Sequence, residues 1–381
     1  MVTVKGRKTS NKNPPILSHE FIIQNHADIV SCVAMVFVVG LMVQVTSPWA
    51  YNFIAIHHNA TTAVPESPDG PILPLKYTTG WKDVCAVFFY FLITIVMHAV
   101  IQEYIFDKIS KRFHLSKSKH SKFNESCQLI TFYVLSAAWG IDIIMRDNLL
   151  LNISSLWESY PGVMSFSLKL FFIGQLAYWL HSYPELYFQR AKKEEILPRI
   201  VLATFGLFFS AAAYVLNFQH VGVILFVLHY VGEALQHGAR LIHFVSHNEK
   251  TTQLAFLVAN AAFIFARLAT VALSGLVFFY GLGQIERSLD FATGKFNIQA
   301  VQYGALGAIL LFQAYLFYSF IKRQMKFTRE NKTPVVSKAK SKQKPRKKDA
   351  KDGKKSEDDD LPEVDQATKK NLRTRYSAKA K

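Results

Sequence analysis

The stretch KLFFIGQLAYWLHSYPELYFQRAKKEE, residues 169–195, decides the fold. It begins as an apolar segment, gains polar and aromatic residues, should break at Pro184, and ends in a basic collar of Arg190, Lys192 and Lys193. An apolar body followed by Tyr and Trp at headgroup depth and then by basic residues is typical of a helix that leaves a bilayer on its cytosolic side. The stretch therefore predicts a membrane-spanning helix and the side on which it ends.

Composition divides the chain into two unlike parts. Half of its 381 residues are hydrophobic, including 31 Phe and 16 Tyr, yet the formal net charge is +17. The apolar residues lie in long runs, whereas 21 of the 44 Lys and Arg lie from residue 322 to the end, where apolar periodicity is lost. Such a basic segment predicts a disordered tail. The remainder is predicted to be an all-α polytopic membrane protein.

Eight apolar runs predict eight membrane-spanning helices, because about 20 residues are needed to cross roughly 30 Å of hydrocarbon. The first run begins only after a long polar leader, and no small-residue cleavage site of the usual kind follows it, so we expect a retained first span. Very few residues separate the fifth and sixth runs, which predicts a tight antiparallel helical hairpin. The eight runs are 29–47, 83–101, 127–145, 165–182, 200–217, 221–240, 254–280 and 301–321.

Basic residues in the short loops predict the orientation. Sixteen Lys and Arg lie in the leader and in or beside the loops 102–126, 183–199 and 241–253, against five in the opposite loops. The positive-inside rule then places both termini in the cytosol. Two glycosylation sequons, at Asn59 and Asn152, fall in the non-cytosolic loops, in agreement with this orientation.

Ionisable and amide side chains occur within the third to eighth runs. At such depth they normally face a bundle interior or a wet cavity. One interpretation is pairing, of Asp142 or Glu233 with Lys169 or Arg267, which would hold the helices in register. The other is a cavity for a lipid or a peptide, whose candidate polar lining residues are Gln175, His181, His229, Glu233 and His237.

A stripe of polar residues marks the sixth run. His229, Glu233 and His237 recur at intervals of four and share one helical face. A histidine and a carboxylate on one face can be an acid–base pair or half a metal site. Neither an H-E-x-x-H spacing nor cysteines outside the apolar runs supply further ligands. We therefore predict a polar stripe, with no catalytic residue, metal or cofactor. Gly304 and Gly307 are expected to allow close helix contact.

The basic tail predicts electrostatic partners. Its sequence KAKSKQKPRKKDAKDGKK, residues 338–355, would be drawn to anionic lipid headgroups or to RNA phosphate. The membrane surface and the ribosome are therefore its candidate partners. Few aromatic side chains interrupt the tail, so sequence-specific reading of RNA by base stacking is not expected.

Several strings resemble the translocating chain-associated membrane protein family. They are PPILSHEFIIQNHADIVSCVAMVF at 14–37, VFFYFLITIVMHAVIQEYIFDKI at 87–109, KHSKFNESCQL at 119–129 and QLAYWLHSYPELYFQ at 175–189. The likeness extends to about residue 327. It implies an accessory of the Sec61 channel, in the endoplasmic reticulum membrane, that contacts signal sequences and nascent chains and assists their translocation or insertion. A bundle rich in polar residues could give this assistance by perturbing local lipid.

Residues 118–327 are also similar to the TLC homology domain of ceramide synthases, which implies that the last six spans surround a membrane-embedded cavity. The His-His pair of those enzymes falls on Leu202 and Ala203, which cannot exchange a proton. A downstream His and carboxylate fall on His229 and Glu233. The resemblance thus implies a cavity without acyl-transfer chemistry. The alternative is a lipid-modifying or lipid-binding membrane protein.

Four regions are therefore expected. A cytosolic leader precedes two spans with their loops, a six-span domain and a disordered basic tail. The expected partners are Sec61, nascent secretory and membrane chains, and membrane lipid. The regions are residues 1–28, 29–117, 118–327 and 328–381.

The orientation predicts which sequons carry glycan. Asn59 should be glycosylated, while Asn124 and Asn331 should not, because the latter two lie on the cytosolic side. Asn152 lies close to two spans, where the transferase has less access, so its glycan is expected at lower occupancy. Mass shifts after endoglycosidase treatment of single Asn→Gln variants measure this. A glycan at Asn331 would reverse the whole topology.

Overall fold

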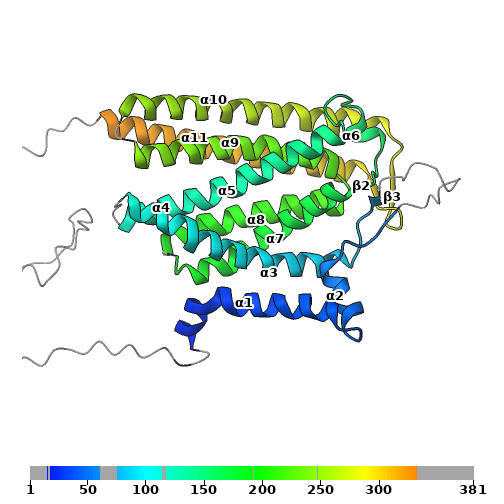
Figure 1. Ribbon diagram of the computed structural model, residues 1–381. Helices are drawn as coiled ribbons and strands as arrows, with labels where there is room; N and C mark the ends of the chain where they lie inside the picture. The colour runs from blue at the N-terminus through cyan, green and yellow to red at the C-terminus, as the bar shows by residue number, and fades with distance from the viewer. Residues whose placement is uncertain are drawn as a thin grey trace, which may run out of the picture. The chain divides into compact units, whose positions relative to one another are not determined.

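Eight long helices make up the described part of the chain up to Lys322, which forms one compact unit (Figure 1). The computed structural model describes residues 15, 18–60, 75–113, 117–191, 193–246 and 248–332, with side chains omitted at 117–118 and 326–332. The eight helices are α1 His19–Met42, α3 Asp83–Ile101, α5 Lys117–Arg146, α7 Phe166–Phe188, α8 Lys193–Val215, α9 Gln219–Val245, α10 Glu249–Ser274 and α11 Gln299–Lys332.

Shorter elements connect or extend these helices. The π-helix η1 Gln102–Phe106 joins α3 to α4 Asp107–Arg112, and α10 continues into η2 Gly275–Gly281 and η3 Leu282–Gln284. At the end of the bundle where β2 and β3 are labelled in Figure 1 lie two small antiparallel sheets. The remaining elements are α2 Ser47–Ile54, α6 Ser155–Glu158, β1 Lys76–Tyr77 paired with β2 Met164–Ser165, and β3 Ser288–Asp290 paired with β4 Lys295–Asn297.

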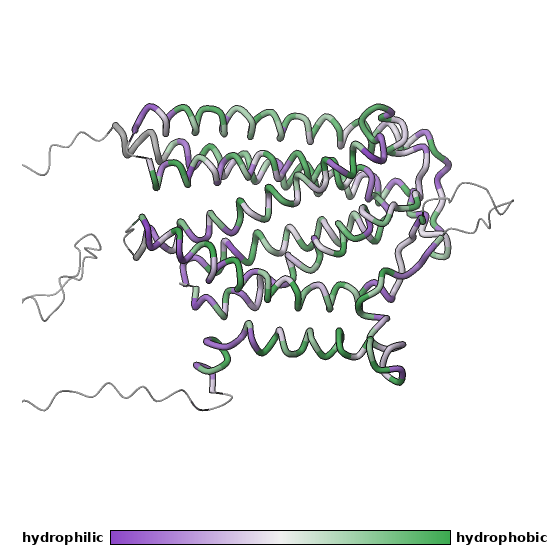
Figure 2. The backbone as a smooth tube through the Cα atoms, in the orientation of Figure 1, coloured by the Kyte–Doolittle hydropathy of each residue, from purple (hydrophilic) through white to green (hydrophobic). Residues whose placement is uncertain are grey.

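All eight predicted spans are helices, but they are not equally apolar. Six are long and apolar enough to cross a membrane, namely α1, α3, α5, α8, α10 and α11. The helices α7 and α9 are as long but carry several buried polar side chains, which lower their mean hydropathy. Nine residues of α7 and thirteen of α9 are buried, against one of α1, so these two helices occupy the interior. Figure 2 shows apolar residues along the helices and polar ones gathered towards their ends.

The first helix begins ten residues before the predicted span. Ser18 caps it, because its hydroxyl oxygen accepts a hydrogen bond from Phe21 N at 3.2 Å. The helix kinks at Asn25, whose φ and ψ are −117° and 18°. It ends at Met42, five residues before the predicted limit, and residues 19–28 of the expected leader form its first turns. Residues 1–14 of that leader, and most of the basic tail, lie outside the described residues.

Pro184 does not end α7, contrary to expectation. The helix continues to Phe188 although proline lacks the N–H that bonds the preceding turn. Packing against α1 explains this: the Phe188 ring stacks on His26 with centroids 4.3 Å apart, and Tyr187 lies 4.8 Å from His19. Contacts of this last turn offset the cost of the proline.

The predicted partner of Lys169 was wrong, because its counter-ion comes from the second span. Lys169 Nζ lies 2.8 Å from Asp83 Oδ1 of α3, and both side chains are almost fully buried. The same nitrogen donates to the carbonyl oxygens of His57 at 2.8 Å and Thr78 at 2.7 Å, so all three ammonium hydrogens are used. The Tyr214 hydroxyl of α8 donates to Asp83 Oδ2 at 2.7 Å. This network joins α3, α7, α8 and the chain on both sides of β1.

Replacing Asp83 with leucine should lower the free energy of unfolding by about 3–5 kcal/mol, because the ammonium of Lys169 would remain buried without its counter-ion. The double variant Asp83→Leu with Lys169→Met should recover most of that loss, since apolar residues of similar size can replace a buried ion pair. Thermal unfolding of the purified chain in detergent measures both effects.

The control is the ion pair of Asp142 with Arg146, at 2.8 Å, whose side chains are 46% and 74% exposed. Asp142→Leu should leave unfolding unchanged, because solvent screens an exposed pair. A double variant as unstable as Asp83→Leu alone would contradict the assignment of the loss to an unpaired charge.

Candidate functional site

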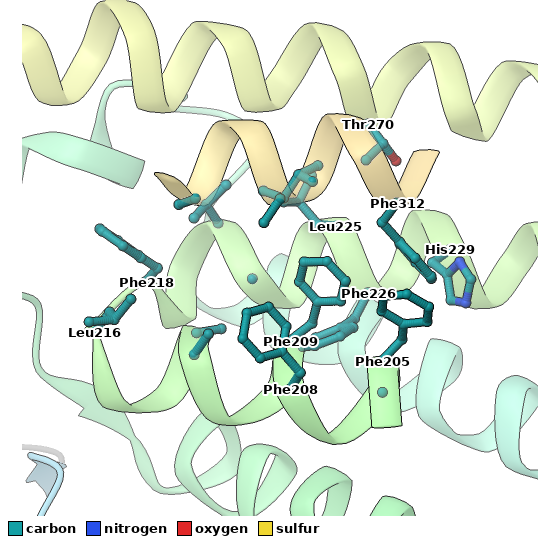
Figure 3. Close-up of a pocket in the computed structure, with 18 of the residues that line it drawn as sticks. Phe205, Phe208, Phe209, Leu216, Phe218, Leu225, Phe226, His229, Thr270 and Phe312 are labelled. Carbon is teal, nitrogen blue, oxygen red and sulfur yellow. The ribbon is translucent and has the colours of Figure 1, made fainter. Parts of the chain in front are cut away.

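An apolar cavity of about 310 Å³ lies between α8, α9 and α11. In Figure 3 the rings of Phe205, Phe208 and Phe209 on α8 lie opposite Leu225 and Phe226 of α9. Residues of α11, from the small Gly304 and Ala305 to the ring of Phe312, complete the wall. The volume lies at the lower end of the range for small-molecule sites, and the lining suits hydrocarbon.

Spacing along α8 creates the aromatic wall. Phe205, Phe208 and Phe209 are three and four residues apart and therefore share one helical face. Residues 216–218 alone connect α8 to α9, which confirms the short connection of the predicted hairpin, while the cavity separates the two helices beyond the turn. The turn is fixed by Tyr160, whose hydroxyl donates to the Leu216 carbonyl at 2.9 Å. Burial raises the pKa of that hydroxyl, so it remains a donor.

The mouth of the cavity lies between α8 and α11, on the side of the bundle. Phe208 lines the cavity and is 54% exposed, and Gly304 lines it from an exposed position on α11. A Cβ added at Gly304 or at Gly307 would meet no described atom within 4 Å. The predicted role of these glycines in close helix contact was therefore wrong, and the missing side chain of Gly304 leaves the mouth open.

A polar network closes the other end of the cavity. Arg267 Nη1 of α10 donates to His229 Nδ1 at 2.9 Å and to Gln313 Oε1 at 3.2 Å. Glu233 Oε1 lies 4.0 Å from Arg267 Nη2, one of the pairings that the sequence suggested. Arginine can only donate, so His229 Nδ1 is the acceptor and Nε2 carries the ring proton. His229 is thereby held as a neutral partner of a buried cation.

The five predicted polar residues lie at different places. His229 lines the large cavity. Gln175 of α7 links α9 to α5, because its side chain accepts from the Tyr230 hydroxyl at 2.7 Å and donates to the Ser136 hydroxyl at 3.1 Å. Glu233 and His237 are buried on α9, at 9% and 6% exposure. His181 lines a second, smaller pocket.

The second pocket has a volume of about 80 Å³ and is more polar. Leu202 lines both pockets and Ala203 lines the smaller one, so the positions that correspond to the His-His pair of ceramide synthases lie beside these spaces. A histidine pair does occur here, but it joins His98 of α3 to His181 of α7 at 3.0 Å. Sequence reasoning missed His98, because its partner lies 83 residues away. It also missed the α8 wall, which the spacing of the phenylalanines could have indicated.

Two of the four sequon residues, Asn59 and Asn152, occupy exposed positions on the described surface. Asn59 forms an isolated β-bridge to Tyr77 of β1. Asn152 precedes α6, and its side-chain oxygen accepts from the Ser154 hydroxyl at 2.8 Å. Asn124 is half-buried and donates to Asp107 at 3.5 Å. Asn331 lies in α11, and its side chain is outside the described residues. Glycosylation itself stays a prediction.

Comparison with known proteins finds relatives in the same two groups that the sequence resembles. The TLC domain family matches residues 122–322. Translocating chain-associated membrane protein 2 of Mus musculus is 43% identical over 84% of this chain and 85% of that protein. The Homo sapiens protein of the same name is 41% identical over the same shares. Ceramide synthase 5 of Mus musculus is 28% identical over 39% of this chain and 36% of that protein. The resemblances seen in the sequence are confirmed.

Alanine at Gly206 should destabilise the chain, whereas alanine at Gly304 should not. A Cβ at Gly206 would lie 2.2 Å from the buried ring of Trp179, and such overpacking costs about 1–3 kcal/mol. At Gly304 there is open space, and alanine favours helix by up to about 1 kcal/mol. Thermal unfolding in detergent compares the two variants. Equal destabilisation would show that α11 closes the space at Gly304.

Proposed function

The chain belongs to the translocating chain-associated membrane protein family, and from this we propose that it is an accessory of the Sec61 protein-conducting channel in the endoplasmic reticulum membrane. In this role it contacts signal sequences and nascent chains as they cross or enter the membrane. The observation that carries the proposal is the apolar cavity whose mouth lies on the side of the bundle.

The size of the cavity limits what it can receive. Ten residues of a signal helix occupy about 1,200 Å³, from a diameter of about 10 Å and a rise of 1.5 Å per residue. The cavity holds about 310 Å³, so it cannot enclose such a helix. It can receive several apolar side chains of a helix lying against the mouth, or part of a lipid acyl chain. Contact is therefore proposed at the groove between α8 and α11.

The proposed role is to assist marginal signals. A strongly apolar signal partitions into lipid unaided, whereas one with polar residues lies near balance. For the second kind a gain of about 1.4 kcal/mol changes entry tenfold. The apolar mouth would receive the apolar side chains of such a signal. Gln313 and Thr270, deeper in the cavity, would be partners for its polar side chains. Withdrawal of a lipid tail into the cavity would also perturb local lipid.

We propose that the chain is not an acyltransferase. The residues at the positions of the ceramide synthase pair, Leu202 and Ala203, carry no group that exchanges a proton. His229 is already the acceptor for Arg267. The alternative function, binding or modification of a lipid, is favoured by the apolar character of the cavity and is separated from the first by the experiment below.

The proposed orientation has both termini in the cytosol. The basic segments before α5, between α7 and α8, and before α10 lie at one end of the bundle, and Asn59 and Asn152 belong to segments at the other end (Figure 1). This separation supports the positive-inside assignment. The basic tail is proposed to reach the ribosome or anionic lipid from the cytosolic side.

A photoreactive benzoylphenylalanine in place of Phe208 tests the proposed contact. In microsomes with stalled nascent chains, irradiation should join this position to the signal sequence. The matched control is Phe265 of α10, which is 70% exposed and lies outside the cavity lining. Equal yields of nascent-chain adduct from both positions would refute a specific groove. An adduct to lipid alone would favour the lipid-binding alternative.

Filling the mouth should impair weak signals selectively. Gly304→Phe places a ring at the mouth, whereas Gly307→Phe, also in open space on α11, lies outside the cavity lining. In reconstituted translocation we expect Gly304→Phe to reduce the translocation of a chain with a weak signal several-fold and to leave that of a chain with a strong signal unchanged. Gly307→Phe should behave like the unaltered protein. Equal dependence of both signals on this protein would contradict the proposed energetic role.

A further inference from the structure

Two histidines and a glutamate meet at the small pocket, apart from the large cavity. His181 and Glu185 lie one turn apart on α7 and share a face, and His98 comes from α3. His98 Nδ1 lies 3.0 Å from His181 Nε2, and His98 Nε2 lies 3.1 Å from Glu185 Oε1. One ligand atom from each of the three residues lies within 4.8 Å of the others.

The ring of His181 is fixed in one tautomer. Its Nδ1 faces the carbonyl oxygen of Tyr178 one turn earlier, and a carbonyl only accepts. Nδ1 therefore carries the proton, and Nε2 presents a lone pair towards His98. A histidine whose second nitrogen donates to a backbone carbonyl is the usual arrangement in metal sites. His181 is 1% exposed, so the surrounding helices hold this orientation.

Glu185 has a carboxylate oxygen that the described residues do not satisfy. Its Oε1 accepts from Gln189 Nε2 at 2.8 Å and lies beside His98. Its Oε2 is buried and has no hydrogen-bond partner in the described part of the chain. A buried anionic oxygen without a donor is unfavourable, and a bound cation would remove the penalty.

The surroundings leave room for an ion. The pocket of about 80 Å³ is lined by all three residues. The nearby guanidinium of Arg199 is directed to Glu125 at 3.2 Å and to Glu195 at 3.4 Å, so its charge is neutralised locally. The π-helix η1 begins one turn after His98, and such segments are frequent at functional sites.

We propose that His98, His181 and Glu185 bind a Zn²⁺ ion, with a fourth position open to the small pocket. Two imidazole nitrogens and one carboxylate are a ligand set of open zinc sites. Ligand atoms about 2.0–2.1 Å from a tetrahedral ion are about 3.3 Å apart, close to the 3.0 Å between His98 Nδ1 and His181 Nε2. One imidazole gives a single nitrogen to an ion, so His98 binds through Nδ1, and a carboxylate oxygen of Glu185 reaches the ion by rotating away from His98 Nε2. Imidazole ligands favour zinc over magnesium or calcium. This site is independent of the proposed contact with nascent chains.

Metal content of the full-length chain tests the site. The protein is purified in detergent with a tag that lacks histidine, stripped with a chelator and dialysed against Zn²⁺ buffered by a competing chelator. We expect about one Zn²⁺ per chain by plasma mass spectrometry. His181→Gln and Glu185→Gln should each weaken binding at least about 100-fold, since even outer partners of a metal site contribute 10–100-fold.

Controls separate loss of a ligand from loss of fold. Glu125→Gln changes a carboxylate that lines the same pocket, and His243→Gln changes a histidine on α9; both should keep the metal. His181→Cys should also bind, and its Co²⁺ form should show a thiolate-to-cobalt charge-transfer band. The proposal would be overturned if the folded protein held no Zn²⁺. It would also be overturned if binding survived His181→Gln and Glu185→Gln, or if the Co²⁺ form of the cysteine variant lacked the charge-transfer band.

Discussion

Hydrocarbon offers no hydrogen-bond partners, so each polar side chain of a membrane helix must be satisfied inside the bundle. Helix α7 meets this constraint at three depths. Near its start Lys169 is paired with Asp83, near its middle Gln175 is bonded to α5 and α9, and near its end His181 contacts His98. Because Asp83 and His98 both belong to α3, that helix is fixed against α7 at two points. Their register is therefore set by polar contacts, and apolar packing fills the space between.

The positions of the helices were predictable because the thickness of the hydrocarbon sets the length of an apolar run. The ends were less predictable, since they depend on local contacts. Ser18 caps a helix that begins ten residues before the first predicted run, and the rings of His19 and His26 support α7 beyond Pro184. The rule that proline ends a helix could not be corrected from the sequence alone, because the sequence does not show that α1 stacks against this last turn of α7.

The candidate site was predictable only in part, for a similar reason. Helical periodicity places His229 and Glu233 on one face of α9, and the suggestion of Arg267 as a counter-ion agrees with the structure. Spacing along a chain does not tell which helices are neighbours, however, so Asp83 was not recognised as the partner of Lys169. The resemblance implied a cavity, but its place between α8 and α11 was not predicted, because it depends on which side chains of neighbouring helices leave space between them.

The two-point attachment of α3 has a consequence for the biogenesis of this protein. Roughly 86 residues separate Asp83 from Lys169, and at about 5–20 residues per second their synthesis takes about 4 to 17 s. During that delay the carboxylate at one end of α3 and the imidazole at the other have no partner from α7. The nascent helix must therefore keep both ends in contact with water, headgroups or a sheltering protein, and it can settle fully among its neighbours only after the fourth span has left the ribosome.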